Sequence, residues 1–94
     1  MCYEPISEKY FESNIEHIKY VQNKLNKNMF SDMYTSLNDF LYELGLDSKF
    51  GCDLGWNVNR GLIDVSFSTQ LSPDNRPCLV INYITMPEYN YQDY

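Results

Sequence analysis

The stretch LIDVSFSTQ, residues 62–70, decides the fold class because its hydrophobic pattern has a period of two. The apolar set is Ile63, Val65 and Phe67, and the polar set between them is Asp64, Ser66 and Ser68. Successive side chains of a β-strand point to opposite faces of the sheet. The stretch therefore predicts a strand from Leu62 to Gln70 with one buried face and one face in water.

Two further strands are expected on either side of this one. Residues 50–56 predict a short strand that is interrupted by two glycines. Residues 78–86 are apolar on both faces, as in a central strand, and Pro77 suits the first position of that strand. Turn-forming residues fill 57–61 and 73–76. Consecutive strands with short connections favour an antiparallel meander.

The first part of the chain has a helical period instead. A first helix is expected from Pro5 or Ser7 to Asn28, because proline and serine suit a helix start and asparagine a helix end. Its apolar positions recur at spacings of three and four and form one stripe: Phe11, Ile15, Ile18, Val21, Leu25 and Met29.

A second helix is expected from Asp32 to Leu44, with Ser31 as its N-cap and Gly45 as its C-terminal glycine. Its predicted buried stripe consists of Met33, Leu37, Phe40, Leu41 and Leu44. Two such helices need an apolar surface to cover, and a sheet supplies one.

These elements predict a single α+β domain over residues 1–94. Two N-terminal helices would pack on one face of a three-stranded antiparallel sheet, in the order ααβββ. The tyrosine-rich tail, residues 87–94, has three alternatives that stay open: an edge strand, a segment packed along the sheet, or a flexible end.

The charge balance restricts the partners. The chain has 13 acidic and 7 basic residues, for a net charge of −6. Direct nucleic-acid binding normally needs a surface of lysine and arginine, so it is not expected here. An acidic chain can instead bind a basic surface, including the nucleic-acid channel of another protein.

The cysteines and the terminus indicate the compartment. Cys2, Cys52 and Cys78 are odd in number and widely spaced, which fits neither a disulfide framework nor a zinc site. Residues 1–7 do not have the pattern of a secretion signal, and no apolar run is long enough to cross a membrane. We expect a cytoplasmic protein with reduced thiols.

Four glutamates recur at a spacing of four: Glu4, Glu8, Glu12 and Glu16. On one helix they would share a face, about 6 Å apart along the axis. Like charges at this spacing cost stability, so the row needs a reason. One interpretation is that acids suit the positive end of the helix dipole. The other is that the row displays charge to a basic partner.

Tyrosine is the other excess, with nine residues. Tyr89 and Tyr91 lie in the tail beside Glu88 and Asp93, a combination that protein-binding surfaces use. The alternative, held as equal, is that the tail packs along the sheet edge. Trp56 is the single tryptophan, and we expect it in the core rather than at a binding surface.

No pattern predicts catalysis, a metal site or a cofactor. His17 has no plausible nucleophile and acid around it, and Cys78 has no neighbouring base. Asp53, Asp64 and Asp74 lie in separate elements without the spacing of a calcium loop. The sequence predicts a protein that is not an enzyme.

Three stretches carry a resemblance to known proteins: LNDFL at 37–41, GWN at 55–57 and PCLVINY at 77–83. They resemble small proteins carried by mobile elements of low-GC Gram-positive bacteria, a group that includes anti-CRISPR and other anti-defence proteins. The resemblance implies a small acidic protein that blocks a basic nucleic-acid groove, and it assigns no functional residues.

The hypothesis from the sequence is therefore a non-enzymatic inhibitor of a nucleic-acid-processing defence enzyme, such as a CRISPR effector nuclease. Its expected contact residues are Glu4, Glu8, Glu12, Glu16, Tyr89 and Tyr91. The alternative is a structural or assembly module of a phage or conjugative element, which self-associates through a strand edge or the tyrosine tail.

Overall fold

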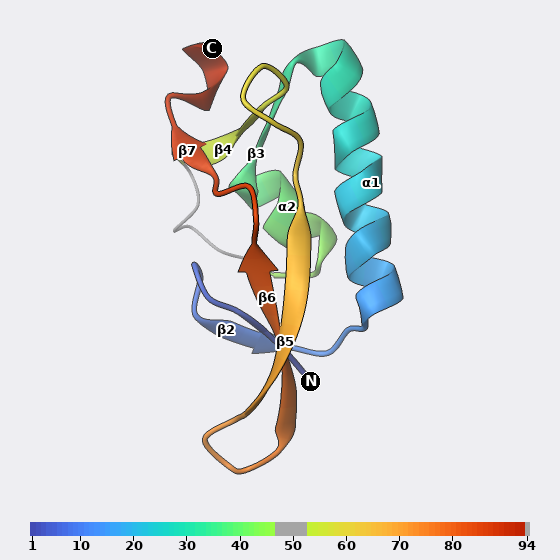
Figure 1. The fold of residues 1–94 in the computed structure, drawn as a ribbon, viewed down its shortest axis with the longest axis vertical. Helices are drawn as coiled ribbons and strands as arrows, with labels where there is room; N and C mark the ends of the chain where they lie inside the picture. The colour runs from blue at the N-terminus through green and yellow to red at the C-terminus, as the bar shows by residue number, and fades with distance from the viewer. Residues whose placement is uncertain (47–52, 94) are drawn as a thin grey trace.

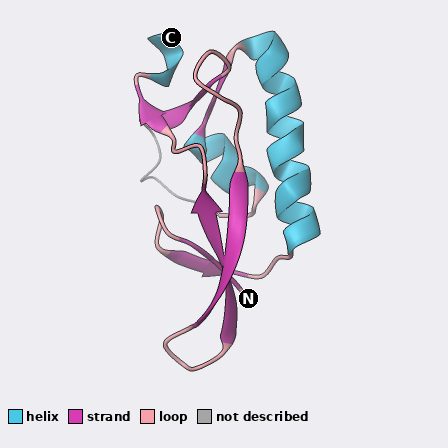
Figure 2. Ribbon diagram, in the orientation of Figure 1, coloured by secondary structure: helices cyan, strands magenta, loops and turns pink. Residues whose placement is uncertain are grey.

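The computed structural model describes residues 1–46 and 53–93 of the chain. It is an α+β fold with two helices and two sheets (Figures 1 and 2). One sheet has four strands in the order β2-β1-β6-β5, and the other has three in the order β3-β4-β7. The elements are β1 (Cys2–Glu4), β2 (Lys9–Phe11), α1 (Ile15–Asp32), β3 (Tyr34–Ser36), α2 (Leu37–Glu43), β4 (Leu54–Asn57), β5 (Val65–Leu71), β6 (Pro77–Tyr83), β7 (Glu88–Tyr89) and a final 3-10 turn (Tyr91–Asp93).

The predicted ααβββ layout, with both helices on one three-stranded sheet, is wrong. β5 and β6 do form an antiparallel hairpin, but β4 belongs to the other sheet, where it pairs with β3 and β7. The neighbour of β6 is instead β1, in parallel. The predicted strand at 50–56 corresponds to β4 from Leu54 onward; Asp53 lies in a turn, and residues 50–52 lie outside the described part of the chain.

Residues 2–11 form a hairpin rather than a helix, because the backbone of β1 pairs with a distant strand. Cys2 is buried and lies opposite Leu79 of β6. The Glu4 carboxylate turns the chain after β1: it accepts the backbone N–H of Ile6 at 2.8 Å and that of Ser7 at 2.7 Å. The predicted start of the first helix at Pro5 or Ser7 is therefore wrong.

α1 begins only after Asn14, whose side chain accepts the backbone N–H of His17 at 2.8 Å. It continues beyond the predicted end at Asn28 to Asp32. Met33 then takes a left-handed conformation, with φ of 74°, and its N–H donates to the Met29 carbonyl. The predicted stripe is buried at Ile18, Val21, Leu25 and Met29, whereas Ile15 is exposed.

The second helix is shorter than predicted. Residues 34–36 form β3, and Ser36 caps α2 by accepting the Asp39 N–H at 3.0 Å. Leu37, Phe40, Leu41 and Leu44 are buried as predicted, but Met33 is exposed. Gly45 ends the helix with φ of 86°, which confirms its predicted role.

The core lies between the helices and the two sheets. Trp56 is 2% exposed, so its predicted core position is confirmed. Its ring lies 5.8 Å from that of Phe40 and 6.0 Å from that of Tyr83, centroid to centroid. Burial, together with the nearby Glu4 carboxylate, raises the pKa of the Tyr83 hydroxyl far above its ordinary value.

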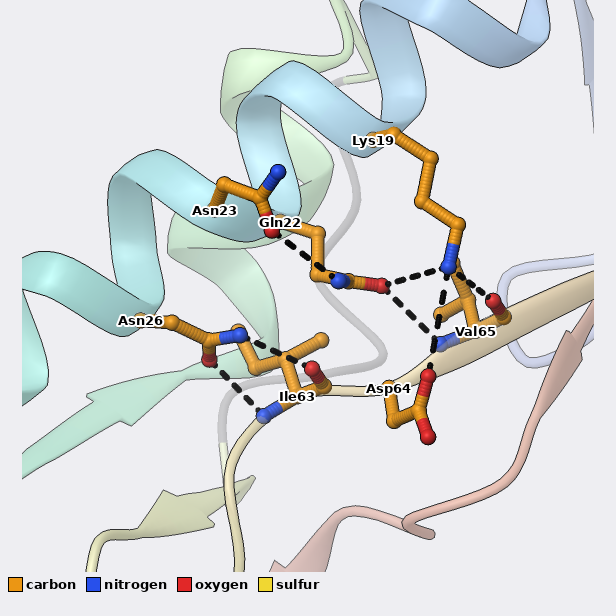
Figure 3. A network of polar contacts seen from close by, with 7 residues as sticks. All are labelled: Lys19, Gln22, Asn23, Asn26, Ile63, Asp64 and Val65. Atoms are coloured by element: carbon orange, nitrogen blue, oxygen red, sulfur yellow. Dashed lines mark hydrogen bonds and ion pairs between the residues drawn. The ribbon is translucent and has the colours of Figure 1, made fainter.

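Helix α1 is joined to the start of β5 by side chains that bond to the strand backbone (Figure 3). The Asn26 amide accepts the Ile63 N–H at 2.8 Å and donates to the Ile63 carbonyl at 2.9 Å. The Gln22 carbonyl accepts the Val65 N–H at 3.0 Å, and the Lys19 ammonium donates to the Val65 carbonyl at 2.6 Å. Ile63 and Val65 are buried, as the alternation predicts, while Asp64 between them reaches solvent and pairs with Lys19.

Neither helix in the described residues is long and apolar enough to cross a membrane.

Candidate protein-interaction surface

The end of the chain is packed onto the three-stranded sheet. β7 pairs with β4, with Tyr89 opposite Leu54 and Glu88 opposite Gly55. The following residue, Asn90, turns the chain with φ of 58°. Of the three alternatives for the tail, residues 88–93 therefore adopt a short strand and a packed turn.

Tyr91 holds this segment in place. Its side chain is buried, and its backbone carbonyl accepts the Asn57 amide at 2.8 Å. Its ring lies edge-on to that of Tyr34, with centroids 5.7 Å apart. A Cβ at Gly55 would come within 2.8 Å of the Tyr91 ring, so only glycine leaves room for it. Tyr91 is thus an anchor for the segment rather than an exposed contact residue.

An open hollow of about 530 Å³ lies beside this segment, and six residues line it: Asp53, Tyr89, Asn90, Tyr91, Gln92 and Asp93. Tyr89 is 65% exposed, so its ring is available to a partner. The described residues that line the hollow include two carboxylates and no lysine or arginine. The hollow combines tyrosine, amide and acid, which suits contact with a basic surface.

The electrostatics of the hollow follow from burial and from its acids. Burial, chiefly, and the nearby Asp39 and Asp53 carboxylates raise the pKa of the Tyr91 hydroxyl, while a hydrogen bond with Gln92 opposes that shift. Tyr91 therefore stays uncharged around neutral pH. Within residues 1–46 and 53–93, neither Asp53 nor Asp93 forms an ion pair.

Several other acids are partly compensated by basic side chains. Lys19 pairs with Asp64 at 3.9 Å and Lys24 with Glu43 at 3.1 Å. Arg60 pairs with Glu88 at 3.4 Å and Arg76 with Asp74 at 3.2 Å. Among the residues that the structure describes, the acids outside these ion pairs include the two carboxylates of the hollow, Asp53 and Asp93.

The four glutamates predicted to line one helix face lie in different elements, so the ladder itself is wrong. Glu4 is fully buried in β1, and Glu8 sits in the following turn with φ of 57°. Glu12 is exposed, 3.7 Å from the terminal amine, and Glu16 lies in the first turn of α1. A signal in the sequence marks the true helix start: Asn14, an N-cap residue, directly precedes the unbroken part of the apolar stripe.

The residues considered for catalysis or metal binding lie apart. His17 is exposed on α1, with its ring 6.4 Å from that of Tyr20, and Cys78 is buried in β6. Asp64 and Asp74 pair with basic residues in separate places. Among the described residues, no group of three or more histidine, cysteine or acidic side chains could hold a metal ion.

Comparison with known proteins gives a family. The model of a family of unknown function, DUF6353, matches residues 1–92. The chain belongs to this family. No curated protein and no solved structure matches it. The matched region of this DUF6353 chain includes both sheets and the hollow as far as Gln92.

Proposed function

We propose that this DUF6353 chain is a non-enzymatic binding protein whose hollow at Tyr89 contacts a basic surface of a partner protein. The observation that carries the proposal is the exposed Tyr89 ring beside Asp53 and Asp93, two carboxylates outside every ion pair of the described residues. Tyrosine gives contact area at low entropic cost, and the carboxylates attract and orient the partner.

The partner we propose is a nucleic-acid-processing enzyme of a bacterial host, such as a CRISPR effector nuclease. Such enzymes carry basic channels, and a small chain with a net charge of −6 is complementary to them. Binding there would exclude the nucleic acid and inhibit the enzyme, in the host cytoplasm and without contact to a membrane.

The fixed position of Tyr89 favours this surface over the exposed glutamates. The backbone of Tyr89 is held by its pairing with Leu54 and by the anchored Tyr91 two residues further along. Because the backbone is already fixed, only the rotamers of the Tyr89 side chain remain to be ordered on binding. Glu8, Glu12 and Glu16 remain proposed contributors to steering, because surface charges act at a distance of about one Debye length, roughly 8 Å at physiological salt.

The test begins with capture of partners from a Gram-positive lysate that contains CRISPR effectors, at low and at high salt, followed by inhibition assays on the recovered enzyme. We expect a nuclease that is recovered at low salt and lost at high salt, and that the chain inhibits. Tyr89→Ala should weaken inhibition by about 30-fold or more, which corresponds to the ~2 kcal/mol threshold of an interface hot spot.

Matched variants make the test specific. Tyr42 on α2 is also exposed, so Tyr42→Ala removes the same side chain elsewhere and should leave inhibition unchanged. The pair Asp53→Asn and Asp93→Asn should reduce the salt dependence of association more than Glu12→Gln and Glu16→Gln do. If Tyr42→Ala weakens inhibition as much as Tyr89→Ala does, or if Tyr89→Ala leaves inhibition unchanged, the hollow is not the contact surface.

A further inference from the structure

The outer edge of β5 presents backbone groups that point away from the sheet. β5 is the last strand in the order β2-β1-β6-β5, so β6 covers only one of its edges. The N–H of Ser72 donates to Arg76 at 2.8 Å, and the N–H of Ile84 donates to Asp64 at 2.8 Å. In an antiparallel ladder every second residue bonds to the partner strand, so the even-numbered residues of β5 face β6. The odd-numbered residues Phe67, Thr69 and Leu71 therefore direct their N–H and C=O groups outward.

The beginning of this edge is already occupied. Ile63 and Val65 share the outward orientation, and the side chains of Lys19, Gln22 and Asn26 satisfy their backbone groups (Figure 3). Beyond Val65, no hydrogen bond from the described part of the chain reaches the outward groups of Phe67, Thr69 and Leu71. The free edge is thus limited to residues 67–71.

This edge lacks the devices that usually prevent strands from pairing. Natural edge strands carry charges, prolines or bulges. Residues 65–72 contain no charged residue and no proline, and the pairing with β6 is unbroken from Val65 to Leu71. Leu71 is 68% exposed near the hairpin tip. Lys19 marks the beginning of the free edge, with its ammonium 6.0 Å from the centre of the Phe67 ring. In a chain with a net charge of −6, residues 67–71 carry no acidic side chain, so two molecules can meet there without repulsion between carboxylates.

We propose that the β5 edge pairs antiparallel with the β5 edge of a second copy, with the two-fold axis at Thr69. In this register Thr69 faces its own counterpart, and Phe67 faces Leu71 of the other copy. All three pairs are hydrogen-bonded pairs, because the outward groups lie at alternate residues. The interface is isologous, as in most homodimers, and joins the two four-stranded sheets into one.

The ends of the free edge agree with this register. Extending the pairing by two residues would place Val65 opposite Pro73. Val65 is already bonded to α1, and Pro73 has no N–H to donate. By the two-fold symmetry, the pairing between the two copies therefore stops at both ends before the pair Val65–Pro73. Figure 1 shows β5 away from β7 and the C-terminal turn, the segments whose residues line the hollow, so the inference does not rest on the proposed function.

The first test is sedimentation velocity of the full chain from micromolar to millimolar concentration, with Thr69→Pro and Thr69→Val as the matched pair. Proline removes an outward N–H that β6 does not use and places its ring between the two strands, so the hairpin is kept and the dimer is weakened. Losing one hydrogen bond from each copy should raise the dissociation constant by ~30-fold. Thr69→Val keeps the backbone N–H at position 69, so this variant should dimerise with the dissociation constant of the parent. A parent that is monomeric throughout, or a Thr69→Pro variant with the dissociation constant of the parent, would overturn the proposal.

The second test fixes the register and does not depend on how Thr69→Pro folds. Hydrogen-bonded antiparallel pairs have Cα atoms about 5.5 Å apart, which a disulfide can span. Thr69→Cys, in a Cys52→Ser background, should therefore form a disulfide dimer under mild oxidation; the other two cysteines are buried. Gln70→Cys, displaced from the axis and on the other face, should cross-link at least tenfold more slowly. Equal rates for the two variants, or no dimer of Thr69→Cys, would refute the register.

Discussion

The contact between Asn26 and Ile63 gives the sharpest prediction for stability. Asn26→Ala removes both hydrogen bonds, at 2.8 and 2.9 Å, and leaves the Ile63 N–H and C=O without their partner. An unsatisfied buried backbone group costs about 1–3 kcal/mol. Asn26 itself is only half-buried, so water can partly replace the amide and the lower part of that range applies to each group.

The magnitude follows from these terms. Two groups at the lower part of the range give a loss of about 2–4 kcal/mol. Alanine is a better helix former than asparagine, and this difference offsets about 0.5 kcal/mol of the loss. The net loss in the free energy of unfolding should be about 1.5–3.5 kcal/mol, a large fraction of the ~5–15 kcal/mol that holds a small domain together.

The assay is urea denaturation followed by the fluorescence of Trp56, the single tryptophan, which is buried in the core. The midpoint should fall without a change in the slope with denaturant. Asn28→Ala is the control, because Asn28 is exposed on the same helix and the chemical change is the same. A midpoint for Asn26→Ala equal to that for Asn28→Ala would refute the view that the side-chain amide supports the strand backbone.

Three further predictions concern single positions. Gly55→Ala should destabilise the fold by about 1–3 kcal/mol in the same urea assay, because its Cβ would press on the Tyr91 ring and on the Thr35 carbonyl oxygen; an unchanged midpoint would mean that the tail does not pack there. Met33→Gly should raise the free energy of unfolding by about 1 kcal/mol, because Met33 holds a φ of 74° that glycine adopts without strain, whereas Met33→Ala should give no gain. Tyr83→Phe should lose less of its free energy of unfolding than the parent does as the pH rises above about 10. The folded-state pKa of Tyr83 is raised, so the stability it confers is complete below the unfolded pKa of about 10 and falls by about 1.4 kcal/mol per pH unit above it. Stability curves of the parent and Tyr83→Phe that stay parallel above that pH would contradict this.

Local patterns in the sequence predicted local structure well. The alternation at Ile63 and Val65, the hairpin of β5 and β6, and the glycine that ends α2 all depend on residues close together in the chain. The burial of Trp56 also follows from its chemistry. These features do not depend on which distant segments pair with each other, so they can be predicted from a single sequence.

The failures concern pairings between distant segments. The spacing of the four glutamates fits a helix, but residues 2–4 gain more by pairing with β6, which lies more than seventy residues further along. Likewise the local sequence of residues 34–36 predicts a helix, because their pairing with β4 depends on residues about twenty positions further along the chain. The hollow was missed for the same reason, since Asp53 meets the tail only through the pairing of β4 and β7. The tail pattern did not separate Tyr89 from Tyr91, one exposed and one buried.

The junction of α1 and β5 explains why the free edge begins where it does. A side-chain amide has the same donor and acceptor as a peptide group, so Asn26 and Gln22 substitute for a neighbouring strand. Four residues along a helix rise about 6 Å, close to the roughly 6.6 Å of two residues along a strand. The helix runs opposite to the strand, so Asn26 meets Ile63 and Gln22 meets Val65.

The next position in this series is Ile18, which would meet Phe67. Isoleucine has no group that can bond to a backbone, and Ile18 is instead fully buried in the core. The side-chain cover of the strand backbone therefore ends at Val65, while the strand itself continues to Leu71. The amides of Gln22 and Asn26 on α1 thus set the position at which the uncovered edge begins.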